Sequence, residues 1–231
     1  MYKGNTFLAI IPARSGSKRL PGKNSLNLNG KPLVKWSIDA GLKSNYIDEI
    51  VVTSDDFNIV NISKKAGVKV VKRSSELATD TATTIDVVAN VIENFPNYDY
   101  IVLLQPTSPL RTEVHIDEAI ELLDIKSADA IVSVCKAEHS PLWSNTLNES
   151  LSMKGFLRDY VHNQRSQDLE SYYRLNGAIY ICNTKTLLRE NRILIEDNIY
   201  AYKMDRGASI DIDEKIDFLM CEKLMEDDTN E

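Results

Sequence analysis

The stretch Ile10-Ile11-Pro12-Ala13-Arg14-Ser15-Gly16-Ser17-Lys18-Arg19-Leu20-Pro21-Gly22-Lys23-Asn24 indicates the fold, because an apolar run breaks here into a small, cationic loop. The run that starts at Leu8 predicts a buried strand, and residues 33–42 after the loop have helical spacing. Proteins of the α/β class bind phosphate with such a strand, loop and helix, since backbone N–H groups and fixed cations converge on an anion. Four cations in one loop of a chain with net charge −7 favour an anion site over a solvated turn.

The loop is neither of the two familiar glycine loops. A P-loop needs its second glycine five positions after the first, followed by Lys and Ser or Thr. Here Gly22 comes six positions after Gly16, and Asn24 follows Lys23. This broken spacing disfavours a kinase. A G-x-G-x-x-G fingerprint is also missing, so the chain lacks the Rossmann signature of a dinucleotide site.

Strand-like and helix-like segments alternate through most of the chain. This rhythm predicts an α/β fold with a doubly wound, mainly parallel sheet, whose ligands lie beyond the carboxyl ends of the strands. The expected strands are residues 8–11, 50–53, 68–71, 100–104, 130–135 and 176–181. The rhythm fails between residues 137 and 175, so we expect an α/β domain of 1–136 and 176–231 with an inserted segment at 137–175.

Composition narrows the class of protein. A chain of 231 residues can form one sizeable core, and a pI near 5.1 disfavours nucleic acid as a partner. No apolar run reaches the ~20 residues that a membrane helix needs, and we expect no membrane partner. Three cysteines without paired spacing are typical of reduced thiols, which predicts a cytoplasmic protein.

The segment Ser209-Ile210-Asp211-Ile212-Asp213 places two carboxylates two residues apart. In an extended chain both lie on the same side, where they repel unless a cation separates them. A hard divalent ion bound to carboxylates and phosphate oxygens resolves this repulsion. The alternative is a cap for the helical segment 216–225, and Asp213 could serve in both ways.

Several segments together resemble the acylneuraminate cytidylyltransferases, also called CMP-sialic acid synthetases. The resemblance covers nearly the whole chain, with Leu175 in place of the family's usual Pro. It rests on Ala13-Arg14-x-Gly16-Ser17-Lys18 with Lys23-Asn24, Arg73-Ser74-Ser75-Glu76-Leu77, Gln105-Pro106-Thr107-Ser108-Pro109-Leu110-Arg111, Arg174-x-Asn176-Gly177-Ala178-Ile179-Tyr180 and Ser209-x-Asp211-x-Asp213.

The resemblance implies a fold and a set of site residues. The fold would be the Rossmann-like nucleotidyltransferase fold, with residues 137–175 as a dimerisation arm. The implied catalytic residues are Lys23, Arg14, Lys18 and Arg165. The implied nucleotide-binding residues are Arg14, Ser17, Lys18, Lys23, Asn24, Arg73, Ala82 (through its backbone) and Thr84. The implied acyl-sugar residues are Gln105, Arg165 and Arg174, and the implied Mg²⁺ ligands are Asp211 and Asp213. Arg111 holds either the loop or the ligand.

The activity that the resemblance implies is transfer of CMP from CTP to the anomeric hydroxyl of a nine-carbon acidic sugar, with release of pyrophosphate. The partners would be CTP, Mg²⁺, the sugar and a second copy of the chain. Two alternatives stay open: activation of a related acid such as legionaminic acid or Kdo, and a nucleotide-binding regulatory subunit without turnover.

Overall fold

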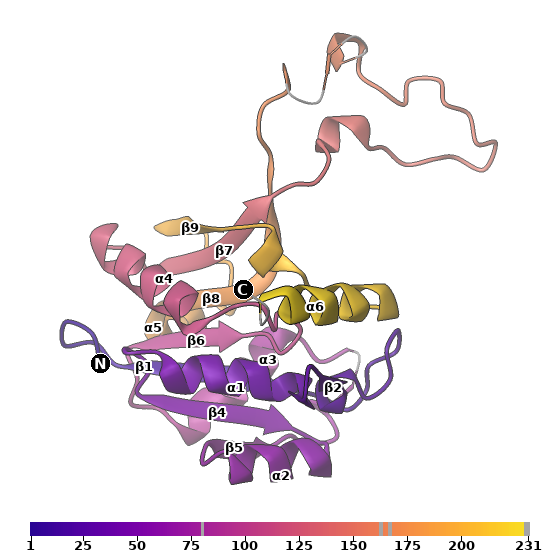
Figure 1. Ribbon diagram of the computed structural model, residues 1–231. Coiled ribbons are helices and arrows are strands. Elements are labelled where there is room, and N and C mark those ends of the chain that lie inside the picture. Colours follow the sequence, from indigo (N-terminus) through magenta and orange to yellow (C-terminus); the bar gives the residue numbers. More distant parts are fainter. Residues whose placement is uncertain (80, 162–163, 166–167, 229–231) are drawn as a thin grey trace.

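A single twisted sheet organises the protein (Figure 1). The computed structural model describes residues 1–79, 81–161, 164–165 and 168–228. In this described part the sheet has seven strands in the order β5-β4-β1-β6-β8-β7-β9. Their bounds are β1 Phe7–Pro12, β4 Glu49–Ser54, β5 Lys69–Lys72, β6 Tyr100–Leu104, β7 Ala130–Lys136, β8 Tyr173–Asn183 and β9 Ile199–Met204.

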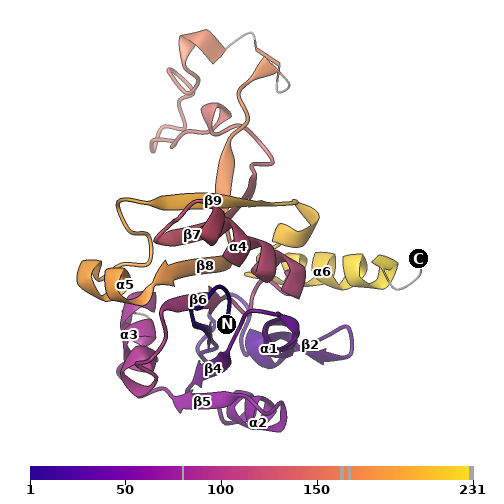
Figure 2. The same cartoon turned by 90° about the vertical axis from the view of Figure 1, so that its left-hand side faces the viewer.

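Helices cover both faces of the sheet, as the view along its edge shows (Figure 2). Helices α1, α2 and α4 pack on one face, and α3 and α5 pack on the other. The bounds are α1 Leu33–Lys43, α2 Phe57–Lys65, α3 Thr84–Asn94, α4 Glu113–Ile125, α5 Thr184–Glu190 and α6 Lys215–Asp228. The prediction of a doubly wound, mainly parallel sheet is therefore confirmed.

Strand β1 shows why its sequence is apolar at every position. Leu8 and Ile10 belong to the core on one face, whereas Ala9 and Ile11 belong to the core on the other. Successive side chains of a strand point to opposite faces, so a central strand between two helix layers is apolar throughout. Strand β1 pairs in parallel with both β4 and β6, and its carboxyl end delivers the cationic loop to the edge of the sheet.

Polar residues set the helix starts. Thr83 caps α3 in a reciprocal capping box with Asp86, and the carboxylate of Asp56 accepts from the backbone N–H of Asn58 at the start of α2. A short hairpin of β2 (Asn27–Leu28) and β3 (Lys31–Pro32) precedes α1, so Pro32 is the N-cap of this helix. Its helical residues begin one position later than Pro32.

Two elements of the carboxyl-terminal half differ from a simple parallel arrangement. Strand β8 runs antiparallel to both β6 and β7, and β9 adds a parallel edge strand that the sequence analysis did not predict. Several β9 residues are exposed, including Tyr200 and Lys203, because β9 lies at the edge of the sheet. The apolar run that marks the central strands is therefore absent from it.

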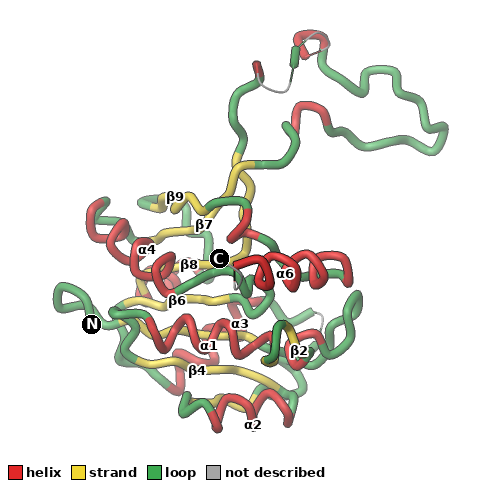
Figure 3. Tube along the Cα trace, viewed as in Figure 1, coloured by secondary structure: helices red, strands yellow, loops and turns green. Residues whose placement is uncertain are grey.

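The segment between β7 and β8 projects from the body of the protein as a long excursion (Figures 1 and 3). Its described residues contain short 3₁₀ turns, such as Pro141–Trp143 and Asp159–Val161, and otherwise irregular chain. Lys136 pairs with Tyr173 across β7 and β8, so residues 173–175 of the expected arm belong to strand β8. No helix within the described residues is both long and apolar enough to cross a membrane.

Candidate active site

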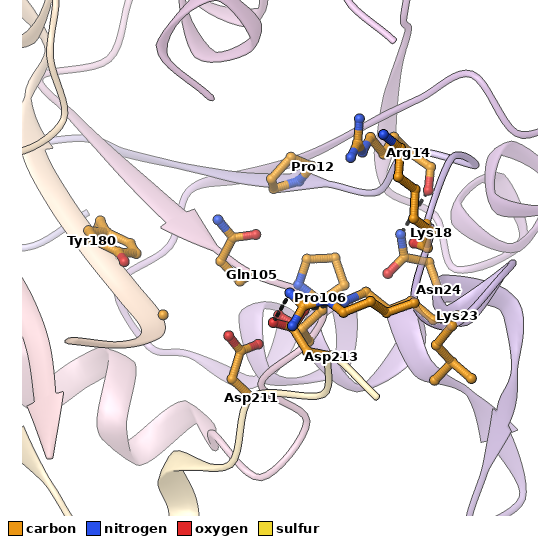
Figure 4. Close-up of a pocket in the computed structure, with 15 residues that line it drawn as sticks. Pro12, Arg14, Lys18, Lys23, Asn24, Gln105, Pro106, Tyr180, Asp211 and Asp213 are labelled. Carbon is orange, nitrogen blue, oxygen red and sulfur yellow. Dashed lines mark hydrogen bonds and ion pairs between the residues drawn. The ribbon is translucent and has the colours of Figure 1, made fainter. Parts of the chain in front are cut away.

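Two adjoining cavities lie beyond the carboxyl ends of β1 and β6. The larger has a volume of about 500 Å³ and is lined by the cationic loop, the turn after β6, strand β8 and the segment that carries the acidic pair (Figure 4). The smaller, of about 240 Å³, is lined by Arg73 and the start of α3. Pro12, Arg14 and Gln105 line both, so the two cavities are neighbours.

Lys23 and Arg19 bring the cationic loop against the acidic segment. Lys23 Nζ donates to Asp213 Oδ1 at 3.0 Å and to the carbonyl oxygen of Ile212 at 2.7 Å. Arg19 Nη2 donates to the other carboxylate oxygen of Asp213, Oδ2, at 2.5 Å. Two cations thus neutralise Asp213 at the wall of the larger cavity, where Figure 4 shows these contacts as dashed lines.

The loop is fixed to its surroundings at both ends. Asp55 accepts from the backbone N–H of Ser15 at 2.9 Å and from its hydroxyl at 2.5 Å. Burial by itself would raise the pKa of Asp55, but these bonds lower it below its usual value. Asn24 Nδ2 donates to the carbonyl of Arg14, and Arg14 Nη1 donates to the carbonyl of Thr79. The loop therefore has a defined position before any ligand binds.

The smaller cavity has a buried cation at its wall. Arg73 is 6% exposed, and one guanidinium nitrogen donates to the carbonyl of Thr53 while Nε has no partner among the described residues. Burial lowers the pKa of Arg73. Ala82 and Thr84 line the same cavity, with the Ala82 N–H donating to Thr79 Oγ1 at 3.3 Å. A guanidinium with an unpaired N–H suits a ligand with ring or carbonyl acceptors.

Both members of the acidic pair, Asp211 and Asp213, line the larger cavity. Burial raises the pKa of Asp211, the Asp213 carboxylate adds to this rise, and a hydrogen bond from Thr107 opposes it. The segment is held in place because the Ile212 N–H donates to the carbonyl of Thr107 at 2.8 Å. Arg19 and Lys23 form ion pairs with Asp213. Among the described residues, no cation forms an ion pair with Asp211.

The side chain that accepts hydrogen bonds at the start of α6 belongs to Asp217 and not to Asp213. Asp217 Oδ2 accepts from the backbone N–H of Asp213 at 3.0 Å and of Glu214 at 2.7 Å, just before α6 begins. The Asp213 side chain points instead to the cationic loop. The Asp213 carboxylate therefore forms part of the cavity wall and does not cap the helix.

The two arginines expected to bind the sugar lie elsewhere. Arg174 forms a bidentate pair with Glu138, with distances of 3.1 and 2.8 Å, and this pair lowers the pKa of Glu138 to about 2. Both residues line a third cavity, of about 420 Å³, that shares Asp211 and Asp213 with the larger one. Arg165 is exposed on the projecting segment and lines neither of the two main cavities formed by the described residues.

The remaining sequence-predicted residues converge on the main cavities. Lys18, Ser17, Asn24 and Gln105 line the larger one. Arg19 and Tyr180 line it too, although neither was assigned to the site from the sequence. Arg19 belongs to the same run of cations and could have been included on that ground. Tyr180 gave no separate signal, because a strand residue in an apolar run is usually core.

Comparisons with known proteins show the family to which the chain belongs. The family model described as Cytidylyltransferase matches residues 8–228, so the chain belongs to the cytidylyltransferase family of nucleotidyltransferases. It is 40% identical over 217 residues to the N-acylneuraminate cytidylyltransferase of Streptococcus agalactiae, covering 92% of this chain and 51% of that protein. It thus spans about half the length of this relative. The resemblance found in the sequence is confirmed.

Two further comparisons extend the picture. The CMP-N,N'-diacetyllegionaminic acid synthase of Legionella pneumophila is 37% identical over 231 residues, covering 95% of this chain and 96% of that protein. The solved structure of a CMP:2-keto-3-deoxy-manno-octonic acid synthetase complexed with CTP superposes with a TM-score of 0.74 at 18% identity. It covers 96% of this chain and 99% of its own. This structural likeness supports the fold alone.

Proposed function

We propose that this protein transfers CMP from CTP to the anomeric hydroxyl of a nine-carbon acidic sugar and releases pyrophosphate. One observation carries the proposal: a cavity walled by Lys23, Arg19 and the Asp211–Asp213 pair adjoins a smaller one with a buried arginine. The first suits a triphosphate and the second a pyrimidine nucleoside. The names of the two relatives support an acidic sugar as the acceptor.

The nucleotide would occupy both cavities. Arg73, the Ala82 backbone and Thr84 would hold the cytosine and ribose, since an arginine fork and N–H groups match the acceptors of a pyrimidine. Arg14 lines both cavities and would therefore lie between the base and the phosphates. Ser17, Lys18, Lys23 and Asn24 would contact the triphosphate.

The acidic pair fits a magnesium ion. Mg²⁺ in nucleotide sites takes one or two carboxylates together with phosphate oxygens. Asp211 and Asp213 supply two, and among the described residues no group of three or more His, Cys, Asp or Glu side chains is placed to hold a metal by itself. Burial raises the pKa of Asp211 and the like charge of Asp213 adds to the rise, so a bound cation would favour the charged form of Asp211. When bound, the ion would neutralise charge on the phosphate oxygens.

Cationic side chains of this chain would stabilise the negative charge that develops during the reaction. In the reaction the anomeric oxygen bonds to the α-phosphorus, the bond from that phosphorus to the bridging oxygen breaks, and the hydroxyl proton is released. Lys23, with Arg14 and Lys18, would stabilise the negative charge that gathers on the departing pyrophosphate. The fixed loop positions these cations in advance, and positioning of this kind lowers the barrier.

The acceptor sugar would lie between Gln105 and the base of the projecting segment. Gln105 lines both main cavities, and Arg174 lines the adjoining one. A planar guanidinium can hold the sugar carboxylate with two hydrogen bonds. Glu138 occupies that fork in this structure, so a substrate carboxylate would take its place.

We also propose a homodimer in which residues 137–175 of one copy complete the site of the other. Large apolar side chains of the projecting segment are exposed in the described chain, namely Leu147, Leu151, Met153 and Tyr160. A second exposed apolar set, Ile216, Leu219, Met220 and Leu224, recurs at helical spacing on α6. Arg165 would reach an active site only across such an interface.

A single assay tests the proposed function. Pyrophosphate release is measured with CTP and Mg²⁺ against N-acetylneuraminic acid, legionaminic acid, Kdo and a neutral hexose. We expect turnover with a nine-carbon acid and none with the hexose. Absence of pyrophosphate with every acid, despite calorimetric binding of CTP, would instead support a nucleotide-binding regulatory subunit.

A further inference from the structure

Arg111, in the segment between β6 and α4, is a buried charge. It is 1% exposed and is the largest fully buried side chain among the described residues. None of the ion pairs between described residues includes it, and burial lowers its pKa to about 9, so it stays protonated at neutral pH. Burying a charge without a counter-ion costs free energy of folding. Its presence therefore needs a reason other than packing.

One side of the guanidinium fixes the turn after β6. Arg111 Nη2 donates to Ser37 Oγ at 2.6 Å, and Ser37 Oγ donates in turn to the carbonyl oxygen of Gln105 at 3.1 Å. This relay crosses from the loop to helix α1 and back. It holds the backbone of Gln105, the residue that lines both main cavities.

The other side of the guanidinium fixes strand β8. Arg111 Nη1 donates to the carbonyl oxygen of Ala178 at 3.3 Å. The preceding residue, Gly177, has φ +77°, and a Cβ built on it would lie 3.6 Å from Asp211 Oδ2. The backbone of β8 thus passes close to the acidic pair at the point where Arg111 holds it.

The buried arginine at position 111 can be compared with an apolar side chain in the same place. A methionine of similar length would fill the same space without the cost of desolvating a charge, and replacement of buried ions by apolar groups is often neutral or stabilising. A charge kept in the interior against that cost is typical of residues that serve a site rather than the fold. Here the acceptors that the charge binds all support walls of one cavity.

We propose that Arg111 is a positioning residue for the acceptor sugar, fixing Gln105 through Ser37 and fixing the β8 wall through Ala178. It does not touch substrate and acts through these neighbours. The proposal rests on the proposed function of the cavity. It answers the question that the sequence left open, because Arg111 holds the loop and not the ligand.

The direct test compares Arg111→Met with wild type and with Arg189→Met, the same change at an arginine whose side chain is 70% exposed. We expect Arg111→Met to raise the sugar KM by about 10- to 100-fold, the scale of a misplaced binding group. Its melting temperature should not fall, and its calorimetric Kd for CTP should match wild type. Arg111→Lys should recover part of the loss, because it keeps the charge but lacks the planar fork that directs two N–H groups to separate acceptors.

An unchanged sugar KM in Arg111→Met would overturn the proposal. So would a joint loss of CTP affinity, sugar affinity and melting temperature, since that pattern marks a general structural role. Wild-type protein is assayed first: lack of any turnover there contradicts the proposed function, whereas wild-type turnover together with an unchanged sugar KM in Arg111→Met contradicts only the role of Arg111.

A double-mutant cycle covers the case in which Arg111→Met does not fold. The variants are Ser37→Ala, Gln105→Ala and their combination, with sugar KM as the readout. If Arg111 acts through this relay, the effect of Ser37→Ala on the sugar KM should disappear once the Gln105 side chain has been removed. Additive effects of the two substitutions would contradict the relay.

Discussion

Lys23 Nζ lies 3.0 Å from Asp213 Oδ1, so an ion pair joins two residues 190 positions apart in the sequence. The Lys23 side chain is only 12% exposed, whereas that of Asp213 is 40% exposed. A partly buried pair of this kind is screened less than a surface pair. It links the loop after the first strand to the segment before the last helix, and both meet at the wall of one cavity.

The first prediction concerns the two aspartates, which the structure makes unequal. Asp211→Asn removes a carboxylate whose pKa is raised by burial, so its charged form weakens the fold at neutral pH. Asp213→Asn removes the partner of Lys23 and Arg19. Without metal, we expect Asp211→Asn to melt at or above the wild-type temperature and Asp213→Asn to melt below it.

Both substitutions should nevertheless lower kcat by at least ~100-fold if the pair holds Mg²⁺, the scale of losing one preorganised electrostatic group. Turnover with saturating CTP and Mg²⁺ is the measurement, and Asp217→Asn serves as a control at the carboxylate that caps α6. An active but destabilised Asp211→Asn would rule out the metal assignment.

The second prediction concerns the base. The smaller cavity, at about 240 Å³, suits a pyrimidine beside Arg73. We expect CTP to be turned over in strong preference to UTP, GTP and ATP, because a mismatch leaves buried polar groups unpaired. Competition assays with each triphosphate measure the ratio of kcat/KM. Equal turnover of ATP and CTP would exclude this slot.

The third prediction uses the pair of Glu138 and Arg174. The Glu138 pKa lies near 2 in the folded protein against an ordinary value of 4.5, so the pair contributes stability above about pH 4.5. That contribution is lost as the pH falls from 4.5 through about 2. The melting difference between wild type and Glu138→Gln should therefore shrink over this window, and it should be small throughout because both side chains are 39% exposed.

The same variant tests the role of Arg174 in binding. Glu138→Gln frees the guanidinium fork from a charged competitor. If Arg174 binds the sugar carboxylate, the sugar KM should fall in Glu138→Gln, and Arg174→Lys should raise it since an ammonium cannot bind in the bidentate manner. A sugar KM that responds to neither change would remove Arg174 from the binding site.

The fourth prediction concerns shared sites. Lys23→Ala and Arg165→Ala should each be inactive alone, and a mixture of the two chains should regain activity if residue 165 serves the neighbouring copy. The readout is turnover after subunit exchange that is verified by a mass or fluorescence label. A fully active monomer by light scattering would contradict the dimer, and no recovery despite exchange would show that each site is self-contained.

Most of the fold could be predicted from local sequence patterns. Apolar runs such as 100–104 revealed central strands because a strand covered on both faces must be apolar throughout. The edge strand β9 was not predicted, because Tyr200 and Lys203 are exposed and an edge strand need not be apolar throughout. The antiparallel direction of β8 depends on how the projecting segment returns, which residue patterns do not specify.

Site residues were predictable where a motif concentrates one kind of chemistry. The cations of the first loop and the aspartate pair form such motifs, and both line the larger cavity. Partners that act over long sequence distances were not predictable. The sequence does not reveal that Glu138 occupies the fork of Arg174, or that Asp55 fixes Ser15, because each contact depends on the folded path of the chain.

The pairing of Lys136 with Tyr173 makes the projecting segment a long hairpin connection between hydrogen-bonded neighbours. Its ends are held together by the sheet, and doubling the length of such a connection costs only about 0.6 kcal/mol of closure entropy. Insertions or deletions in this segment should therefore change the free energy of unfolding of the α/β body only slightly. The length of this segment can therefore drift between related chains while the sheet that carries the candidate site keeps its geometry.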